Sequence, residues 1–309
     1  MLDLLKSLAD PCRLRLIVVL LRGEFTVQEL TRMLNMGQSR ISRHLKILME
    51  AGALTVKRQA TWNYYRAGDA NPLFNALLPA LEQGLESLPS REEDLASLAG
   101  ILEERRSRSQ DFFDRYALQW DNLFQKLMPT PDYQDRLLNA IPIGGTTLEV
   151  GIGTGGLLRR LSRDSKLVIG VDNSPVMLEE TKRRCASSCL NNVELRLGEM
   201  THLPLASSSV DCVIANMVLH HATNPTTVLQ ELGRVLVPGG LLLLADLSRH
   251  EKEWVRERLA DQWLGFGHNE LLEWLKNAGF EAIEIESLIE PGKDSVLLAR
   301  GQKPQADAV

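Results

Sequence analysis

The sequence predicts two domains, a small α+β domain followed by a larger α/β domain with a mostly parallel sheet. The first part of the chain alternates short amphipathic helices with two strand-like runs. From residue 146 onward, strand, glycine-rich turn, helix and strand follow one another, which is typical of α/β folds. A chain of 309 residues is long enough for this division. The predicted boundaries are 1–88, a helical linker over 89–110, 111–300, and a flexible tail over 301–309.

Charge is distributed unevenly along the chain. Residues 1–68 carry 11 Lys+Arg and 5 Asp+Glu, a net charge of +6, and the remainder carries 24 and 35, a net charge of −11. A basic N-terminal segment (residues 1–68) followed by an acidic remainder indicates a polyanionic partner for the N-terminal segment alone. No apolar run approaches the roughly 20 residues that span a bilayer. We therefore expect a cytoplasmic protein without a membrane partner.

The basic N-terminal segment contains a helix-turn-helix pattern. Asp10-Pro11 suits a helix start, and Thr26 with Glu29 forms a capping box that opens a short helix. A turn over 35–37 separates that helix from a second one, whose inward positions are predicted to be Ile41, Leu45, Leu48 and Met49. In such a motif the second helix enters the major groove of DNA.

The outer face of the second helix and the strands after it supply the candidate DNA contacts. Residues 54–66 are predicted to form two strands around a turn, a wing whose cations can contact phosphates. The candidates are Gln38, Ser39, Arg40, Ser42, Arg43 and Lys46 on the helix, and Lys57, Arg58 and Arg66 in the wing.

Three segments make residues 2–85 resemble the ArsR family of winged-helix repressors: Leu8–Leu16, Ser42–Leu48 and Tyr64–Arg66. The resemblance implies a homodimer on double-stranded operator DNA, with an apolar helix from Leu73 to Leu85 at the dimer interface. Metal-sensing relatives carry thiolates where this chain has Thr26-Val-Gln, so we predict no metal site there. Cys12 is a lone thiol, interpreted as a small packed residue.

The larger domain begins with a strand–loop–helix–strand unit. A strand over 146–150 leads into Gly151-Ile-Gly-Thr-Gly-Gly, and a later strand ends at Asp172. This pattern places backbone close to a ligand and a carboxylate where a ribose diol would lie. It also fits a nicotinamide dinucleotide. Glu149 before the first glycine and Glu199 after the third strand favour a ligand with a cationic amino-acid end and an adenine.

Two later segments extend this pattern: a strand over 210–216 that leads into Met217-Val-Leu-His-His, and a Pro-Gly-Gly turn before a strand over 241–245. Residues 110–300 thus resemble the Rossmann-like class I S-adenosylmethionine-dependent methyltransferases, most closely the quinone and small-molecule branch. The resemblance implies that glycines line the methionine and ribose, Asp172 takes the ribose hydroxyls, methionines flank the adenine, and two aromatic residues close over the ligand. The implied cofactor-binding residues are Tyr116, Trp120, Glu149, Gly151, Gly153, Gly155, Asp172, Asn173, Met177, Glu199, Met200 and Asn216.

The methyl acceptor is less well defined. His220 and His221 are the candidate catalytic bases, needed only if the nucleophile arrives protonated. The alternative, that they cap a helix or line a wall, stays open. Asn216 is followed by Met-Val-Leu, which lacks the Asn-Pro-Pro-aromatic motif of nucleic-acid base methylation. Arsenite methylation needs three thiols in the cleft, and the spacing of Cys185, Cys189 and Cys212 disfavours it.

Three functions fit these observations. The first is a transcriptional repressor whose methyltransferase-like domain binds S-adenosylmethionine or S-adenosylhomocysteine as effector. The layout resembles S-adenosylhomocysteine-responsive ArsR-type regulators of methionine-cycle genes. The alternative is an active methyltransferase on a quinone-like small molecule that controls its own operon. A nicotinamide-dependent oxidoreductase tethered to DNA is the third. The missing metal thiolates favour the first, because the signal must then come from the adenosyl-binding loop.

Overall fold

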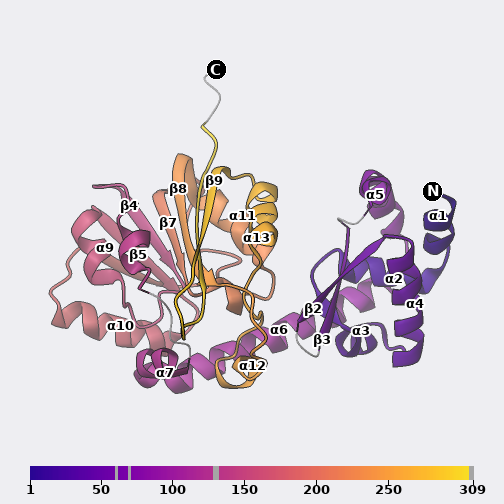
Figure 1. Cartoon of the computed structure of the whole chain (residues 1–309), viewed down its shortest axis with the longest axis horizontal. Helices are drawn as coiled ribbons and strands as arrows, with labels where there is room; N and C mark the ends of the chain where they lie inside the picture. Colours follow the sequence, from indigo (N-terminus) through magenta and orange to yellow (C-terminus); the bar gives the residue numbers. More distant parts are fainter. Residues whose placement is uncertain (60–61, 69–70, 128–131, 306–309) are drawn as a thin grey trace. The chain divides into compact units, whose positions relative to one another are not determined.

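The chain divides into two compact units, Met1–Arg106 and Ser107–Val309 (Figure 1). The structure is a computed structural model, and it describes residues 1–59, 62–68, 71–127 and 132–305. Within these ranges, no helix combines the length and the apolar character that crossing a membrane requires. The predicted division into a small α+β domain and a larger α/β domain is confirmed.

The first unit packs helices around a small antiparallel sheet of order β1-β3-β2. Its elements are α1 (Leu2–Leu8), α2 (Pro11–Leu20), β1 (Phe25–Thr26), α3 (Val27–Leu34), α4 (Gln38–Glu50), β2 (Leu54–Gln59), β3 (Trp62–Ala67), α5 (Pro72–Leu85) and the first part of α6 (Arg91–Tyr116). The helix-turn-helix is α3 and α4, and β2 with β3 forms the wing. The predicted turn of the wing at 60–61 lies outside the described residues.

Local sequence explains where these helices begin and end. The Asp10 carboxylate accepts hydrogen bonds from the backbone N–H groups of Cys12 and Arg13 at the start of α2. The predicted capping box opens α3, and Asn35 ends it in the left-handed conformation (φ 51°). Met49, predicted to face inward, is 36% exposed. It follows Leu48 by one residue, about 100° around the helix, and so lies at the edge of the buried stripe.

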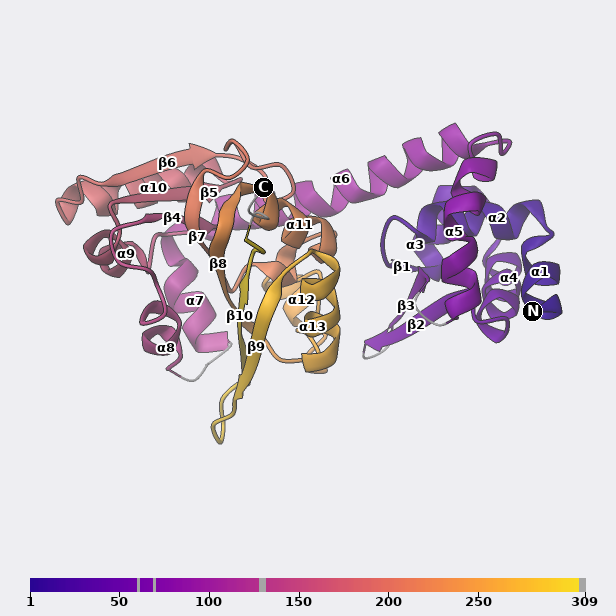
Figure 2. The same ribbon diagram turned by 90° about the horizontal axis from the view of Figure 1, so that it is seen from above.

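The helix α6 is longer than the sequence indicated, because the predicted linker helix and the first part of the aromatic segment form one helix, Arg91–Tyr116. Figure 2 shows it as one unbroken helix. Near its start, the Arg15 guanidinium of α2 donates to both oxygens of Asp94 at 2.7 and 2.6 Å. Asp94 is 1% exposed. A buried bidentate pair of this kind fixes the first turns of α6 against the helix-turn-helix core.

The second unit is built on a seven-stranded sheet of order β6-β5-β4-β7-β8-β10-β9 (Figure 1). The strands are β4 (Thr146–Val150), β5 (Leu167–Asp172), β6 (Val193–Leu197), β7 (Val210–Asn216), β8 (Leu236–Leu247), β9 (Glu281–Leu288) and β10 (Val296–Gln302). The first five are parallel to one another, and β10 runs antiparallel between β8 and β9. Because β8 starts at Leu236, the predicted Pro-Gly-Gly turn lies within the strand.

Helices cover both faces of this sheet. One apolar cluster joins the strands to α11 (Pro225–Val235) and α13 (His268–Asn277), and another joins them to α8 (Gln134–Leu138) and α9 (Leu158–Asp164). The remaining helical elements are η1 (Ala117–Gln119), α7 (Trp120–Leu127), α10 (Pro175–Ser187), η2 (Leu219–His221) and α12 (Val255–Arg258). A parallel sheet buried on both faces leaves its loops at the carboxyl ends of the strands for ligand binding.

Candidate functional site

A cavity of about 740 Å³ lies in the second unit, at the carboxyl ends of β4 and β7. In the strand order, β5 and β6 lie on one side of β4 and β7 lies on the other, so the chain changes direction between β4 and β7. Such switch points are where open α/β sheets bind ligands. Five predicted cofactor residues line the cavity, namely Trp120, Glu149, Gly151, Gly153 and Asn216.

The loop after β4 requires glycine at its first position. Gly151 has φ +64°, and a Cβ atom there would lie 2.1 Å from Val218 Cγ2. The loop is also fixed by hydrogen bonds to the end of β5. The Gly151 N–H donates to Val171 O at 2.8 Å, and the Gly153 N–H donates to Asp172 Oδ2 at 2.8 Å. The backbone therefore forms one wall of the cavity with no side chain in the way.

Glu149 is the buried acid of the cavity. The residue is 3% exposed, and its Oε2 atom has no hydrogen-bond partner among the described residues. Burial, together with the nearby charge of Asp172, raises the pKa of Glu149 to about 8. A buried carboxyl group without a partner is costly to ionise, and a cation bound in the cavity would remove that cost.

Asp172 ends β5 and supports the glycine loop. Its Oδ1 accepts from the Ser174 N–H at 2.9 Å, and its Oδ2 accepts from Gly153. Burial raises the pKa of this carboxyl group, although the backbone N–H groups that it accepts from act in the opposite direction. Asp172 does not line the cavity.

The other predicted cofactor residues also lie outside the cavity. Asn173 Nδ2 donates to Glu199 Oε1 at 3.5 Å, so these two side chains meet beyond the ends of β5 and β6. Met177 is only 1% exposed, and Met200 packs against the sheet core. Those outside the cavity are Tyr116, Gly155, Asp172, Asn173, Met177, Glu199 and Met200.

Polar side chains that the sequence did not single out complete the wall of the cavity. Tyr133 donates its hydroxyl hydrogen to Asn216 Oδ1 at 2.8 Å, and Thr154 donates to Asp121 Oδ1 at 2.7 Å. Trp120 packs against Phe124 with ring centroids 5.7 Å apart. Tyr133 belongs to a segment without strong periodicity, so its role depends on the fold.

The paired histidines lie beyond β7 in a buried cluster with two aspartates. His220 Nδ1 is 2.7 Å from Asp246 Oδ1, while Asp261 Oδ1 is 3.9 Å from His220 Nε2 and 3.8 Å from His221 Nδ1. Burial alone would lower the pKa of His220, but the two carboxylates outweigh it and raise that pKa to about 9. Burial and the adjacent His220 lower the pKa of His221.

His221 also contacts aromatic residues of the last part of α6 and the start of α7. Its ring centroid lies 4.8 Å from that of Phe113 and 6.5 Å from that of Trp120, both edge to face. Neither histidine lines the cavity itself. The sequence analysis missed Asp246 and Asp261, although an acid at the end of the apolar strand Leu241–Ala245 is an unusual buried charge.

Most of the residues that are predicted to contact DNA are exposed in the first unit. Gln38, Ser39, Arg40, Ser42, Arg43 and Lys46 are all exposed on α4, Arg58 is exposed in the wing, and Lys57 and Arg66 are half-buried. Exposure on α4 and at Arg58 makes those side chains accessible to a duplex, and the individual roles of all nine residues in DNA binding stay predictions.

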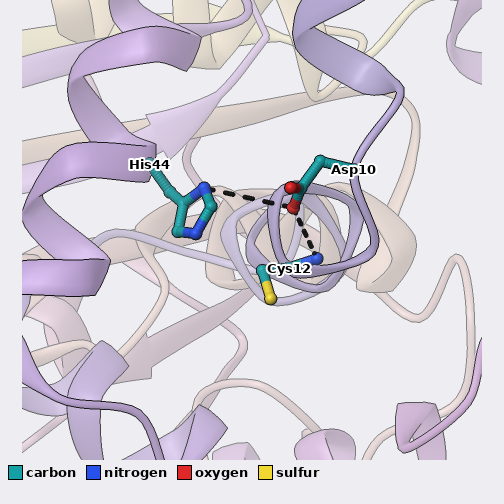
Figure 3. A group of neighbouring side chains, drawn as sticks. All are labelled: Asp10, Cys12 and His44. Carbon is teal, nitrogen blue, oxygen red and sulfur yellow. Dashed lines mark hydrogen bonds and ion pairs between the residues drawn. The ribbon is translucent and has the colours of Figure 1, made fainter.

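The start of α2 contacts α4, the predicted DNA-recognition helix. Arg40 Nη2 lies 3.0 Å from Cys12 Sγ, and His44 Nδ1 lies 4.0 Å from Asp10 Oδ1. Figure 3 shows Asp10, Cys12 and His44 gathered at this junction. The predicted packed role of Cys12 is therefore incomplete, because its sulfur also contacts a candidate DNA-binding side chain.

The other three cysteines lie away from the cavity. Cys212 is buried in β7, Cys185 is half-buried on α10, and Cys189 is exposed just beyond that helix. None of the four thiols of the chain lines the cavity.

Two domain families match this chain. Residues 10–55 match the family described as bacterial regulatory protein, arsR family, and residues 148–244 match the family described as methyltransferase domain. An arsenite methyltransferase from Halobacterium salinarum is 34% identical over 156 residues, which cover 47% of this chain and 40% of that protein. The chain thus spans about two fifths of the length of this relative.

Another relative is more fully covered. An uncharacterized methyltransferase, YodH of Bacillus subtilis, is 33% identical over 172 residues, 54% of this chain and 68% of that protein. In fold, the chain is similar to a structure of a Haloferax volcanii complex between the Trm112 methyltransferase activator and a methyltransferase (TM-score 0.54, 23% identity, 62% of this chain, 98% of that one). This chain therefore belongs to the class I methyltransferases and carries, ahead of that domain, a helix-turn-helix domain of the ArsR family.

Proposed function

We propose that this protein is a DNA-binding transcriptional repressor whose methyltransferase domain binds S-adenosylmethionine or S-adenosylhomocysteine as effector. The observation that carries the proposal is the unpartnered Oε2 atom of Glu149 in a cavity bounded by a glycine loop. Both ligands carry an α-ammonium group, and that cation matches the buried carboxylate in charge and in hydrogen-bonding capacity.

The rest of such a ligand fits the loop beside Glu149. Backbone at Gly151 and Gly153 allows close approach of a methionine chain and a ribose, because no side chain projects there. Asp172 ends the neighbouring strand, where ribose hydroxyls are bound in related folds. In the structure its oxygens accept from backbone N–H groups, so ribose contact requires the spare lone pairs of the same carboxylate.

The helix α6 contacts both the loop next to the proposed ligand site and the helix-turn-helix. In the second unit, Gln110 Nε2 donates to Asn173 O at 3.0 Å, and Ser174 Oγ donates to Asp114 Oδ1 at 2.5 Å. These contacts join α6 to the loop after β5, next to Asp172. In the first unit, the same helix is joined to α3 by ion pairs of Glu104 and Arg105.

A shift of the loop after β5 on ligand binding would therefore act on a helix that also contacts the helix-turn-helix. A dimer would convert such a shift into a change of half-site spacing, which operator affinity depends on. The homodimer is part of the proposal. Its expected interface includes α5, on which Leu73 is 36% exposed.

Operator titrations test the proposal. Binding of the full-length protein to a labelled duplex from the promoter of its own gene is followed by fluorescence anisotropy, with and without each adenosyl ligand. Linkage requires reciprocity, so a ligand that weakens operator binding tenfold must itself bind tenfold more weakly to the operator complex. Equal ligand affinity for free and DNA-bound protein would refute the effector role.

A variant separates ligand binding from DNA binding. Asp172→Ala is expected to abolish the ligand effect and to leave operator affinity unchanged, since Asp172 belongs to the second unit and α4 to the first. Loss of operator binding in this variant, with the protein still folded by circular dichroism, would contradict the proposed coupling.

The second candidate function is an active methyltransferase on a quinone-like small molecule that regulates its own operon. The buried His220–Asp246 pair and the neighbouring His221 favour it, because the lowered pKa of His221 leaves an imidazole that is able to accept a proton. Transfer of a radiolabelled methyl group from S-adenosylmethionine to a component of a host extract would support this function. Tight S-adenosylhomocysteine binding without any turnover would favour the repressor alone.

A further inference from the structure

We propose that His220, His221 and Asp261 bind one divalent transition-metal ion of the zinc class. The three residues lie behind the wall of the cavity and are at most 9% exposed. Their candidate ligand atoms, Nε2 of His220, Nδ1 of His221 and a carboxylate oxygen of Asp261, all lie within 4.8 Å of one another. This site is separate from the adenosyl-binding loop and does not depend on which effector that loop takes.

The spacing of the three atoms suits a small cation. Asp261 Oδ1 lies 3.9 Å from His220 Nε2 and 3.8 Å from His221 Nδ1. Ligands at 2.0–2.1 Å from a tetrahedral zinc ion lie about 3.4 Å apart, so these two separations each have to close by about half an ångström. Two imidazoles and one carboxylate are a common three-ligand set for zinc, with a fourth position left for water.

The buried carboxylate of Asp261, which has no hydrogen-bond partner among the described residues, points to a ligand. It is 4% exposed, and neither of its carboxylate oxygens has a hydrogen-bond partner among the described residues. A buried carboxylate without hydrogen bonds is strongly unfavourable, and such groups are normally paired or coordinate a metal. Its Oδ1 lies 3.9 and 3.8 Å from the ring nitrogens of His220 and His221, so the carboxylate faces the proposed ion position.

Asp246 orients the first imidazole for this role. Its Oδ1 lies 2.7 Å from His220 Nδ1, which leaves Nε2 of the ring directed away from Asp246. The same carboxylate accepts backbone N–H groups from Leu219 at 2.9 Å and Leu247 at 2.7 Å, so it is held in place. Metal-binding histidines usually donate their second ring nitrogen to such a carboxylate, which fixes the tautomer.

Charge also favours an ion at this position. A metal ion would replace the proton that the two carboxylates stabilise on His220, because a ligating imidazole is neutral, and its divalent charge would then offset Asp246 and Asp261. His221 would exchange its long contact to Ala260 O, at 3.4 Å, for the metal. The ion would join the turn after β7 to the segment before Gln262, whose backbone N–H already donates to His220 O at 2.9 Å.

A second trio, Asp10, Cys12 and His44, also has its ligand atoms within 4.8 Å. It is a weaker candidate, because Asp10 Oδ1 accepts two backbone N–H groups and the thiol of Cys12 contacts the Arg40 guanidinium. A cation there would face a positively charged neighbour. The two trios differ in ligand chemistry, since one contains a thiol and the other does not, and this difference allows a direct test.

The experiment uses the full-length protein stripped with EDTA and titrated with Co²⁺, followed by visible absorption and calorimetry. We expect one ion per chain, the visible absorption of tetrahedral cobalt, and no cobalt–thiolate charge-transfer band. Asp261→Asn should weaken binding at least 100-fold, and Asp246→Asn about 10–100-fold. Zn²⁺ should raise the melting temperature of the unchanged protein and not that of Asp261→Asn.

Cys12→Ala is the matched control and should bind Co²⁺ as the unchanged protein does. Circular dichroism establishes that each variant is folded, and His221→Leu replaces Asp261→Asn if the latter is not. Three results would overturn the proposal: no saturable Co²⁺ binding, unchanged binding in a folded Asp261→Asn or His221→Leu variant, or loss of binding with Cys12→Ala.

Discussion

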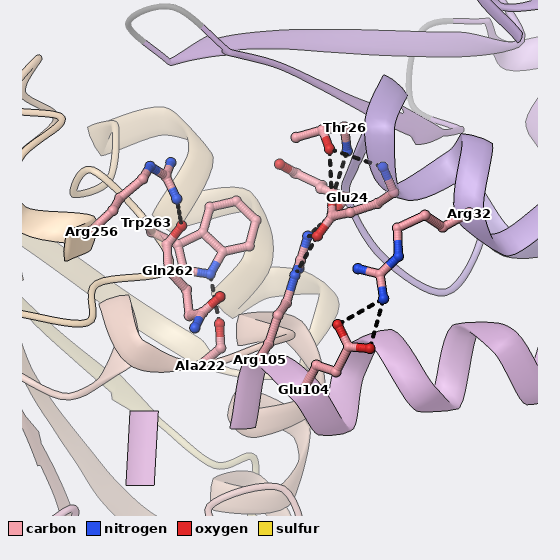
Figure 4. A network of polar contacts seen from close by, with 10 residues as sticks. Glu24, Thr26, Arg32, Glu104, Arg105, Ala222, Arg256, Gln262 and Trp263 are labelled. Carbon is pink, nitrogen blue, oxygen red and sulfur yellow. Dashed lines mark hydrogen bonds and ion pairs between the residues drawn. The ribbon is translucent and has the colours of Figure 1, made fainter. Parts of the chain in front are cut away.

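Arg105 of α6 donates two hydrogen bonds, at 2.8 and 2.5 Å, to Oε1 of Glu29, the acid that caps α3. Figure 4 shows the Arg105 side chain directed toward the start of α3 at Thr26. The other oxygen of Glu29 accepts from the Thr26 N–H at 2.9 Å. One carboxylate therefore both completes the capping box of the helix-turn-helix and fastens α6 to it. Both side chains are largely buried, at 14% and 19% exposure, so the pair is partly protected from solvent screening.

Substitutions of Glu29 separate these two roles. Glu29→Gln retains a capping acceptor and loses the charge that holds Arg105, whereas Glu29→Ala loses both. We expect a loss of unfolding free energy of about 1 kcal/mol for Gln and about 2–3 kcal/mol for Ala, measured by urea denaturation. The ligand response of operator binding should weaken in both variants.

The exposed pair of Arg106 with Glu103 supplies the control for Glu29. These residues are 41% and 59% exposed, so Glu103→Gln should change stability by less than about 0.5 kcal/mol. Equal effects of Glu29→Gln and Glu103→Gln would show that the contact between α6 and α3 contributes little.

Arg43 on α4 is expected to read a base. Arg43→Ala should weaken operator binding by about 1–3 kcal/mol and relax the preference for one base pair. Arg58→Ala in the wing should weaken binding to all sequences alike and reduce the slope of log K against log salt by about one, as loss of a phosphate contact does. Competition assays over single-base operator variants distinguish the two, and identical behaviour of both variants would contradict the assignment.

Gly151 cannot be replaced without disturbing the cavity. Its positive φ disfavours any side chain, and the added methyl group of Gly151→Ala would overlap Val218. We expect a loss of unfolding free energy of about 1–3 kcal/mol and at least a tenfold loss of adenosyl-ligand affinity, measured by denaturation and calorimetry. Gly156→Ala is the control for stability, because a Cβ atom added there would have nothing within 4 Å, although Gly156 also lines the cavity. Similar losses of stability in both variants would mean that the contact with Val218 does not decide the effect of Gly151→Ala.

The sequence predicted those parts of the fold that depend on local rules. The capping box at Thr26, the turn after Asn35 and the strand from Val210 to Asn216 follow from short patterns, and each is present. The length of α6 was not predicted, because its two parts carry different periodicities, one charged and one aromatic. Contacts made along the helix, such as those of Asp94 with Arg15 and of Arg105 with Glu29, help to stabilise it as one helix.

The candidate site was predictable only in part for the same reason. The glycine loop and Glu149 are adjacent in sequence, and they meet at the cavity. The resemblance implied Met177 beside the adenine, and the structure places it in the first turn of α10 at 1% exposure, so its contact with a ligand stays a prediction. Asp261 meets His221 across 40 residues from a segment without periodicity, so no spacing rule could have placed it.

The pH dependence of ligand binding provides the sharpest test of Glu149. With a pKa of about 8 in the unliganded protein, Glu149 is largely neutral at pH 7. A ligand ammonium stabilises the carboxylate, so binding releases a proton, and affinity should rise up to tenfold per unit as pH increases toward 8. Above pH 8 the α-amino group of the ligand itself loses its proton, which places the maximum near pH 8.

Glu149→Gln should remove this rise and lower affinity at every pH, as calorimetry between pH 6 and 9 would show. The same variant should stabilise the unliganded protein, because a carboxyl group whose folded pKa is raised costs stability as pH rises from about 4.5 to 8. At pH 7.5 the gain should be on the order of 3 kcal/mol, and the exposed Glu194→Gln should give none. An affinity that is constant from pH 6 to 8, or a Glu149→Gln variant that is destabilised, would exclude Glu149 as the acceptor of the ligand ammonium.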